Sequence, residues 1–195
     1  KLVLANLKIL SGGLFSHSSN RLGAELEISN DLIIDSGGSI NLNGRGYPND
    51  QGPGKGGSYF ISGWGYIGGG GGYGGLGGYT SYTSGGSAYG NIKEPYDLGS
   101  GGGSPYGGKG GGAVILRSTG TILINGTISA DGTGTTYRQG GGSGGSIYIN
   151  AGKIEGNGLI SVNGGTGGSD GGGGGAGRIA IYYGENNFTG IISAY

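Results

Sequence analysis

Sulfur-containing residues are missing from this chain of 195 residues, which has neither cysteine nor methionine. Without cysteine the protein forms no disulfide and no thiolate metal site, and cysteine usage says nothing about its redox compartment. Because methionine is also missing at position 1, we expect the chain that starts at Lys1 to be a processed product or a fragment of a longer protein.

Net charge and long apolar runs are missing too. The 11 basic and 11 acidic side chains cancel, whereas a nucleic-acid-binding surface needs an excess of basic residues, so nucleic acid is not an expected partner. No run of about 18 apolar residues occurs, so we expect no membrane span, and a signal peptide would already have been removed. The length suits a single domain covering residues 1–195.

Proline is scarce and glycine is abundant, with 4 prolines and 58 glycines. So few prolines, and no sustained Gly-X-Y register, exclude collagen. Disorder is the other usual meaning of such a composition, because glycine loses the most backbone entropy on folding. The placement of the apolar residues argues against disorder.

An apolar motif recurs along the chain and predicts short strands. Within each copy, isoleucine and the residue two later are apolar while the residue between them is polar, which is typical of a strand with one buried face. An Asx-Gly pair then predicts a turn in three of the four copies. The copies are GGSINLNG (37–44), NGTISADG (125–132), NGLISVNG (157–164) and TGIISAY (189–195), and Ile128, Ile160 and Ile192 are spaced by 32 residues.

Two further strand motifs precede this one in each unit. The first is found in LEIS (26–29), GGAVILR (111–117), GGSIYIN (144–150) and AGRIAIY (176–182), and the second in LIID (32–35), TILI (121–124), KIEG (153–156) and NNFT (186–189). Three short strands in about 20 residues make one coil of a solenoid. We therefore predict an all-β fold, a right-handed three-sided parallel β-helix, in which Ile40, Ile128, Ile160 and Ile192 form one interior ladder.

Glycine-rich segments fill the same place in every repeat, at 45–110, 132–143 and 164–177. We expect these insertions to stack at one corner. In GGYGGLGGY (71–79) the large residues recur every third position, which is the period of the polyglycine II helix. The stripe Tyr73, Leu76 and Tyr79 would then cover apolar surface or meet a partner.

A disordered glycine loop is the alternative for parts of 52–110. Disordered segments are poor in aromatic residues, and this one is rich in them. We therefore expect these side chains to be largely shielded from solvent. They are Tyr59, Phe60, Trp64, Tyr66, Tyr82, Tyr89 and Tyr96.

The sequence offers no catalytic constellation, so we expect neither an enzyme nor a cofactor. The only histidine, His17, lies in SHSSN without a nucleophile motif and is interpreted as a solvated turn residue. The acidic residues are scattered, although β-helix lyases and hydrolases need them clustered on one exterior face.

Calcium and glycan sites are weakly indicated. GGTGGSD (164–170) is an imperfect match to a calcium-binding nonapeptide, so no metal site is predicted, and Asp131, Asp170 and Asn163 are the ligands to test. The sequons at Asn125 and Asn187 are consistent with an extracellular protein.

Both ends of the chain carry apolar, strand-like residues where a solenoid would need polar caps. We therefore hypothesise that subunits join end to end or exchange a terminal strand, giving an extracellular filament or surface stalk that is a polymer of this chain. The residues assigned to this assembly are Leu2, Leu4, Leu7, Ile9, Phe188, Ile191, Ile192 and Tyr195.

The motifs GGGGGAGRIAIYY, NGTISADG and NGLISVNGG resemble those of large glycine-rich surface proteins of bacteria, over most of residues 25–195. The glycine triplets alone are loosely similar to phage tail-fibre adhesins and to antifreeze proteins built on polyglycine II bundles. The first resemblance implies an extracellular, cell-surface protein without catalytic activity.

A second hypothesis is an adhesin or carbohydrate-binding module, with a polysaccharide as partner. Trp64, Tyr66, Tyr73 and Tyr79 would then stack on sugar rings. Aromatic residues exposed in a row would favour this hypothesis, whereas aromatic residues buried under the glycine layer would favour a scaffold. An ice-binding surface is less well supported, because no regular threonine ladder follows one strand face.

Overall fold

The computed structural model describes residues 1–19 and 22–195, and the described chain is built from strands without a helix. All strand pairs but one are parallel, and the exception is the antiparallel pair β7 and β8. The predicted all-β class with parallel, solenoid-like sheets is therefore confirmed. The strands are β1 (Leu2–Leu4), β2 (Leu7–Ile9), β3 (Leu14–Phe15), β4 (Ala24–Ile28), β5 (Leu32–Ile34), β6 (Ser39–Asn41), β7 (Ser58–Ile61), β8 (Gly65–Gly68), β9 (Ala113–Ile124), β10 (Thr127–Ser129), β11 (Ser146–Gly156), β12 (Leu159–Ser161), β13 (Arg178–Phe188) and β14 (Ile191–Ser193).

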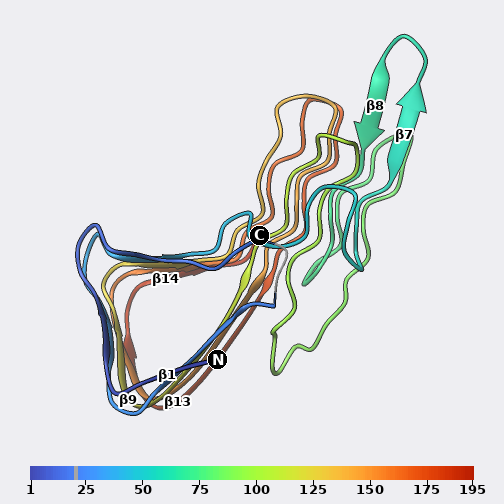
Figure 1. Ribbon diagram of the computed structural model, residues 1–195. Coiled ribbons are helices and arrows are strands. Elements are labelled where there is room, and N and C mark those ends of the chain that lie inside the picture. The colour runs from blue at the N-terminus through green and yellow to red at the C-terminus, as the bar shows by residue number, and fades with distance from the viewer. Residues whose placement is uncertain (20–21) are drawn as a thin grey trace.

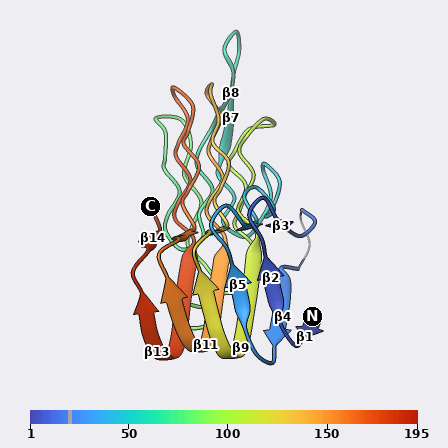
Figure 2. The same cartoon turned by 90° about the vertical axis from the view of Figure 1, so that its left-hand side faces the viewer.

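Two parallel sheets form the body of the molecule. One runs in the order β1, β4, β9, β11, β13, with β2 paired to β5 and β5 paired to the second half of β9. The other runs in the order β14, β12, β10, β6, β3. Figure 2 shows the strands of the larger sheet side by side, from the N-terminal strands on the right to β13 on the left. Successive repeats of the sequence therefore lie in successive layers.

The predicted isoleucine ladder is confirmed by the strand register. Ile128 is paired with Ile40 on one side and with Ile160 on the other, and Ile160 is paired with Ile192. Phe15 continues the ladder beside Ile40, although its short strand lacks the Asx-Gly pair that follows three of the predicted copies. Burying one such side chain contributes about 1.5 to 3 kcal/mol, so the ladder is a main source of stability.

The Asx residues after these strands form a second ladder, which the sequence indicated only as turns. The backbone N–H of Asp131 donates to Oδ1 of Asn43 at 2.8 Å, and that of Asn163 donates to Oδ1 of Asp131 at 2.6 Å. The N–H of Tyr195 donates in the same way to Asn163 at 3.1 Å. Each side chain thus satisfies a backbone donor of the next layer.

The glycine-rich segments leave the body at one place and stand beside one another in a layered block (Figure 1). Their backbones pair with residues three positions apart. The N–H groups of Gly69 and Gly72 donate to Gly57 and Gly54, and those of Gly172 and Gly175 donate to Gly68 and Gly71. The period of three in the sequence is therefore also the period of the hydrogen bonding between neighbouring segments.

The hairpin of β7 and β8 was not predicted. It projects beyond the glycine segments at the far end from the sheets (Figures 1 and 2). Gly63 in its turn and Gly65 at the start of β8 have φ of 79° and 85°, a backbone conformation that favours glycine. The hairpin was missed because its two strands are only four residues each and lie inside the segment 45–110, which was assigned as a whole to a glycine-rich insertion.

Candidate functional site

The hairpin carries large aromatic side chains on its outward face. Phe60 and Tyr66 are cross-strand partners, and their ring centroids are 5.0 Å apart. Both are exposed, whereas Ile67 on the opposite face of the hairpin is buried. The hairpin therefore presents aromatic surface to solvent rather than to the glycine segments.

Trp64 lies in the turn of the hairpin and is held in place by Arg138. The guanidinium carbon of Arg138 is 4.6 Å from the indole centroid, and Nη1 donates to the Trp64 carbonyl at 3.0 Å. Nε of Arg138 pairs with Asp170 at 3.0 Å, and the guanidinium also lies 5.1 Å from the ring of Tyr137. Trp64 is 56% exposed, so it is an oriented and accessible aromatic platform.

Arg138 was missed by the sequence analysis. It is the only charged residue in the segment 132–143 and follows Tyr137 directly. A single cation beside an aromatic residue in an otherwise glycine-rich stretch is the signal that could have identified it.

The expectation that the aromatic residues of this region are shielded is wrong for most of them. The exposed ones are Tyr59, Phe60, Trp64, Tyr66, Tyr82 and Tyr96. The glycine segments satisfy one another's backbone groups and need no aromatic cover.

The predicted stripe of Tyr73, Leu76 and Tyr79 is divided by the fold. Tyr79 is 83% exposed and Leu76 is exposed, but Tyr73 is completely buried. The ring of Tyr73 is therefore closed to ligands, and its assignment as a ligand-stacking residue is wrong.

Tyr73 instead joins the glycine segments to β11. Its hydroxyl donates to Oγ of Ser146 at 2.6 Å, because Ser146 itself donates to the Asp97 carbonyl at 2.6 Å. Its ring lies 4.8 Å from that of Tyr89 and 5.5 Å from the guanidinium carbon of Arg178. This buried junction holds the block of glycine segments on the sheets.

Burial raises the pKa of Tyr73 from its ordinary value of 10.0 to about 12, and burial also raises the pKa of Tyr89. Below pH 10 Tyr73 keeps its hydroxyl proton in both the folded and the unfolded chain, so its ionisation does not reduce the free energy of unfolding. Between pH 10 and pH 12 Tyr73 is ionised in the unfolded chain but still protonated in the folded chain, which favours the unfolded state. We therefore expect the free energy of unfolding to fall by about 2 to 3 kcal/mol over this range because of Tyr73.

Denaturant unfolding at several pH values tests this expectation. Tyr73→Phe is expected to be less stable than wild type at pH 9, because the hydrogen bond to Ser146 is lost, but its stability should fall less steeply above pH 10. Tyr106→Phe, at an exposed position, is the matched control and should keep the wild-type pH slope. An unchanged slope in Tyr73→Phe would show that Tyr73 ionises freely in the folded state.

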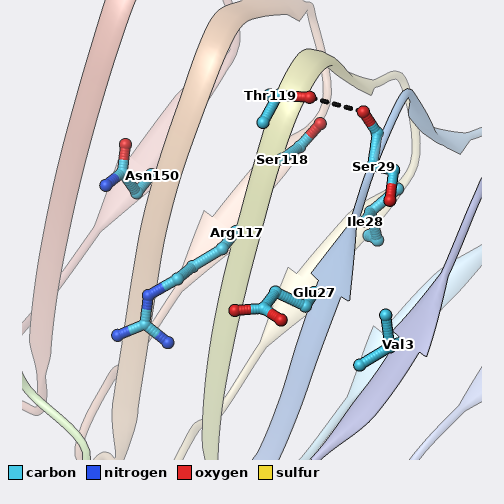
Figure 3. Close-up of a pocket in the computed structure, with 8 residues that line it drawn as sticks. All are labelled: Val3, Glu27, Ile28, Ser29, Arg117, Ser118, Thr119 and Asn150. Atoms are coloured by element: carbon cyan, nitrogen blue, oxygen red, sulfur yellow. Dashed lines mark hydrogen bonds between the residues drawn. The ribbon is translucent and has the colours of Figure 1, made fainter.

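A groove of about 400 Å³ lies on the outer face of the larger sheet (Figure 3). Most of its charged and hydroxyl groups already have partners within the protein. Nη1 of Arg117 pairs with Glu25 at 2.7 Å, Lys1 pairs with Glu27 at 2.9 Å, and Thr119 donates to the Ser29 carbonyl. The groove brings no two carboxylates together and is not assigned a function. It is lined by Val3, Glu27, Ile28, Ser29, Arg117, Ser118, Thr119 and Asn150.

The calcium candidates do not come together. Asp131 accepts hydrogen bonds from Ser161 and Asn163, as part of the Asx ladder, while Asp170 pairs with Arg138 near the hairpin. The described residues, 1–19 and 22–195, hold no group of three or more His, Cys, Asp or Glu side chains that could bind a metal. Asp131 and Asp170 therefore belong to different hydrogen-bonding groups and do not form one site.

His17 is more than a solvated turn residue. Its Nε2 accepts a hydrogen bond from the N–H of Ala113 at 3.2 Å, and its Nδ1 lies 2.8 Å from the Ser18 carbonyl. Nε2 is an acceptor here, so the proton of the neutral ring is on Nδ1. His17 thus satisfies the backbone at the start of β9.

The residues assigned to assembly lie in the first and last layers of the sheets. Leu2, Leu4, Leu7 and Ile9 belong to β1 and β2, which pair with β4 and β5. At the other end Phe188 packs against the core, while Ile191, Ile192 and Tyr195 are exposed. Ile192 occupies the same ladder position as Ile160 but is 53% exposed, against 0% for Ile160.

The two sequon asparagines are both accessible. Asn125 lies between β9 and β10, and Asn187 lies near the end of β13, where its Nδ2 donates to Glu185 at 2.8 Å. Glycosylation at these positions stays a prediction.

None of the described residues belongs to a helix long and apolar enough to span a membrane. Comparisons with protein-family models, with curated proteins and with solved structures found no match to this chain.

Proposed function

We propose that this chain is an extracellular structural protein, built as a right-handed three-sided parallel β-helix with polyglycine II segments stacked at one corner. Three strand positions recur in each repeat. The first two lie in the larger sheet, where each of the long strands β9, β11 and β13 contains both, and the third lies in the smaller sheet. In Figure 1 successive repeats overlie one another in a single outline, which supports this architecture.

Hydrogen bonding supports the polyglycine II assignment. A polyglycine II helix makes no internal hydrogen bonds and pairs sideways with its neighbours. The buried segment 68–72 is bonded to six other segments, which surround it. They are 54–57, 77–78, 84–86, 101–103, 140–141 and 172–175.

The function as a self-assembling filament or surface-stalk subunit rests on the exposure of Ile192. β13 and β14 end their sheets within the described residues, so their outer edges offer unpaired backbone groups beside an uncovered ladder. Such an edge is a template for a further parallel coil. We assign that coil to another copy of this chain, because every layer of the ladder presents a similar apolar face.

The test uses two neighbouring residues that face opposite sides of β14. Ile192→Lys places a charge on the core ladder and should prevent stacking, whereas Ile191→Lys, in register with Leu159 on the outer face, should not. Electron microscopy and light scattering of the purified chain are expected to show filaments for wild type and Ile191→Lys only. Filaments of Ile192→Lys, or a monomeric wild type, would contradict the proposal.

A second candidate function, carbohydrate binding, is favoured by the exposure of the hairpin aromatics. Trp64 is oriented by Arg138 and reaches solvent, as a sugar-stacking platform requires. The matching prediction is that Trp64→Ala weakens binding to polysaccharide by about tenfold, which corresponds to about 1.4 kcal/mol.

Binding to immobilised polysaccharides of different composition is the measurement. Tyr106→Ala removes an even more exposed ring outside the hairpin and should leave binding unchanged. Arg138→Lys keeps the charge but loses the planar contact with Trp64, so it should weaken binding as well. Equal affinities of wild type and Trp64→Ala would exclude the hairpin as the binding site.

A further inference from the structure

Tyr59 and Tyr82 lie against each other near the end of the block of glycine segments that carries the hairpin. Their ring centroids are 6.0 Å apart and their planes differ by 18°. Each side chain is 50% exposed. Tyr59 comes from β7, and Tyr82 comes from a turn 23 residues later.

The backbone on both sides of this pair is well defined. β7 is paired to β8 with Tyr59 opposite Ile67. The turn before Tyr82 is closed by Thr80, whose Oγ1 accepts from the N–H groups of Tyr82 at 3.1 Å and Thr83 at 3.0 Å. The two rings are therefore kept together by the fold.

We infer that Tyr59 and Tyr82 are a site of oxidative cross-linking to dityrosine. Each phenol loses one electron and one proton to give a tyrosyl radical. The radicals combine through ring carbons next to the hydroxyls, and each ring regains its aromaticity by moving the hydrogen from that carbon to the oxygen. Two electrons and two protons leave in total, and hydrogen peroxide used by a haem peroxidase accepts them to form two molecules of water.

The geometry favours this pair over the other two tyrosine pairs. Tyr73 and Tyr89 are closer, but Tyr73 is buried and its hydroxyl donates to Ser146. Tyr148 is also buried beside Tyr182, at 5.7 Å. Of these three pairs, only the stacked pair of Tyr59 and Tyr82 exposes both phenols to an oxidant and a proton acceptor in solvent.

The composition of the chain directs oxidation to these rings. Cysteine and methionine are the side chains that oxidants attack most readily, and the chain has neither. Oxidising equivalents therefore reach tyrosine and the single tryptophan. The cross-link would close a covalent ring from residue 59 to residue 82 that includes the buried segment 68–72, a role that a disulfide cannot take in a chain without cysteine.

Oxidation of the full chain at low concentration tests the inference. One arm uses a haem peroxidase with hydrogen peroxide, and a second uses a photoexcited ruthenium complex with persulfate, which needs no enzyme docking. We expect blue dityrosine fluorescence in a chain that still migrates as a monomer, and a linked peptide pair containing residues 59 and 82 by mass spectrometry.

Tyr59→Phe and Tyr82→Phe keep the ring but not the phenol, so each should lose the linked pair while keeping the wild-type unfolding midpoint. Tyr106→Phe is the matched control and should retain it. Undiminished intrachain fluorescence in Tyr59→Phe would overturn the inference. So would links formed only between chains or other tyrosines, or no link with either oxidant under conditions that couple added free tyrosine.

Discussion

Alanine at position 172 is expected to cost the protein about 3 kcal/mol or more of its free energy of unfolding, because it combines overpacking with lost backbone hydrogen bonds. A Cβ atom on Gly172 would lie 1.9 Å from the carbonyl oxygen of Gly78. The N–H of Gly172 also donates to Gly68 at 3.0 Å. The methyl group would therefore force two segments apart and weaken the bonds around segment 68–72.

Gly173→Ala is the matched control, one residue away in the same segment. A Cβ atom on Gly173 would lie no closer than 3.9 Å to its nearest neighbour, the carbonyl oxygen of Gly165, which is an ordinary van der Waals distance. We expect a change within about 1 kcal/mol, since replacing glycine at an unstrained position reduces the entropy of the unfolded chain. Urea unfolding of both variants is the measurement. Equal losses would show that glycine is not required here for close packing.

Ile128→Ala is expected to lower the free energy of unfolding by about 4 kcal/mol, through lost burial and the cavity that remains. Ile128 is completely buried between Ile40 and Ile160. Rigid neighbours on both sides, paired through the strands, prevent the gap from closing.

The same change at Ile192 isolates the effect of position within the ladder. In the unassembled chain its side chain reaches solvent, so Ile192→Ala is expected to cost about 1 kcal/mol there. Thermal and urea unfolding of the two variants give the comparison. A loss at Ile192 as large as at Ile128 would mean that the end of the ladder is covered in solution. Stacking of copies would cover it in this way. In that case the loss at Ile192 should depend on protein concentration.

The ladder of isoleucines could be predicted from the sequence, because strand alternation and a constant repeat are enough to place equivalent residues in register. LEIS (26–29) and TILI (121–124) were found in the same way, and their strands are β4 and the second half of β9. The period of three in the glycine segments likewise indicated that neighbouring segments bond through their backbones. Local periodicity determines which residues share a face.

Periodicity does not determine what lies opposite that face. Tyr73 and Tyr79 occupy equivalent positions in one stripe, yet Tyr73 is buried against Ser146 and Tyr79 is exposed. Arg138 meets Trp64 from a segment 74 residues away, and no local pattern joins the two. The sequence by itself determined the repeat, the strands and the glycine period. Only the tertiary structure decided which aromatic rings are buried and which reach solvent, because that depends on contacts between segments distant in the chain.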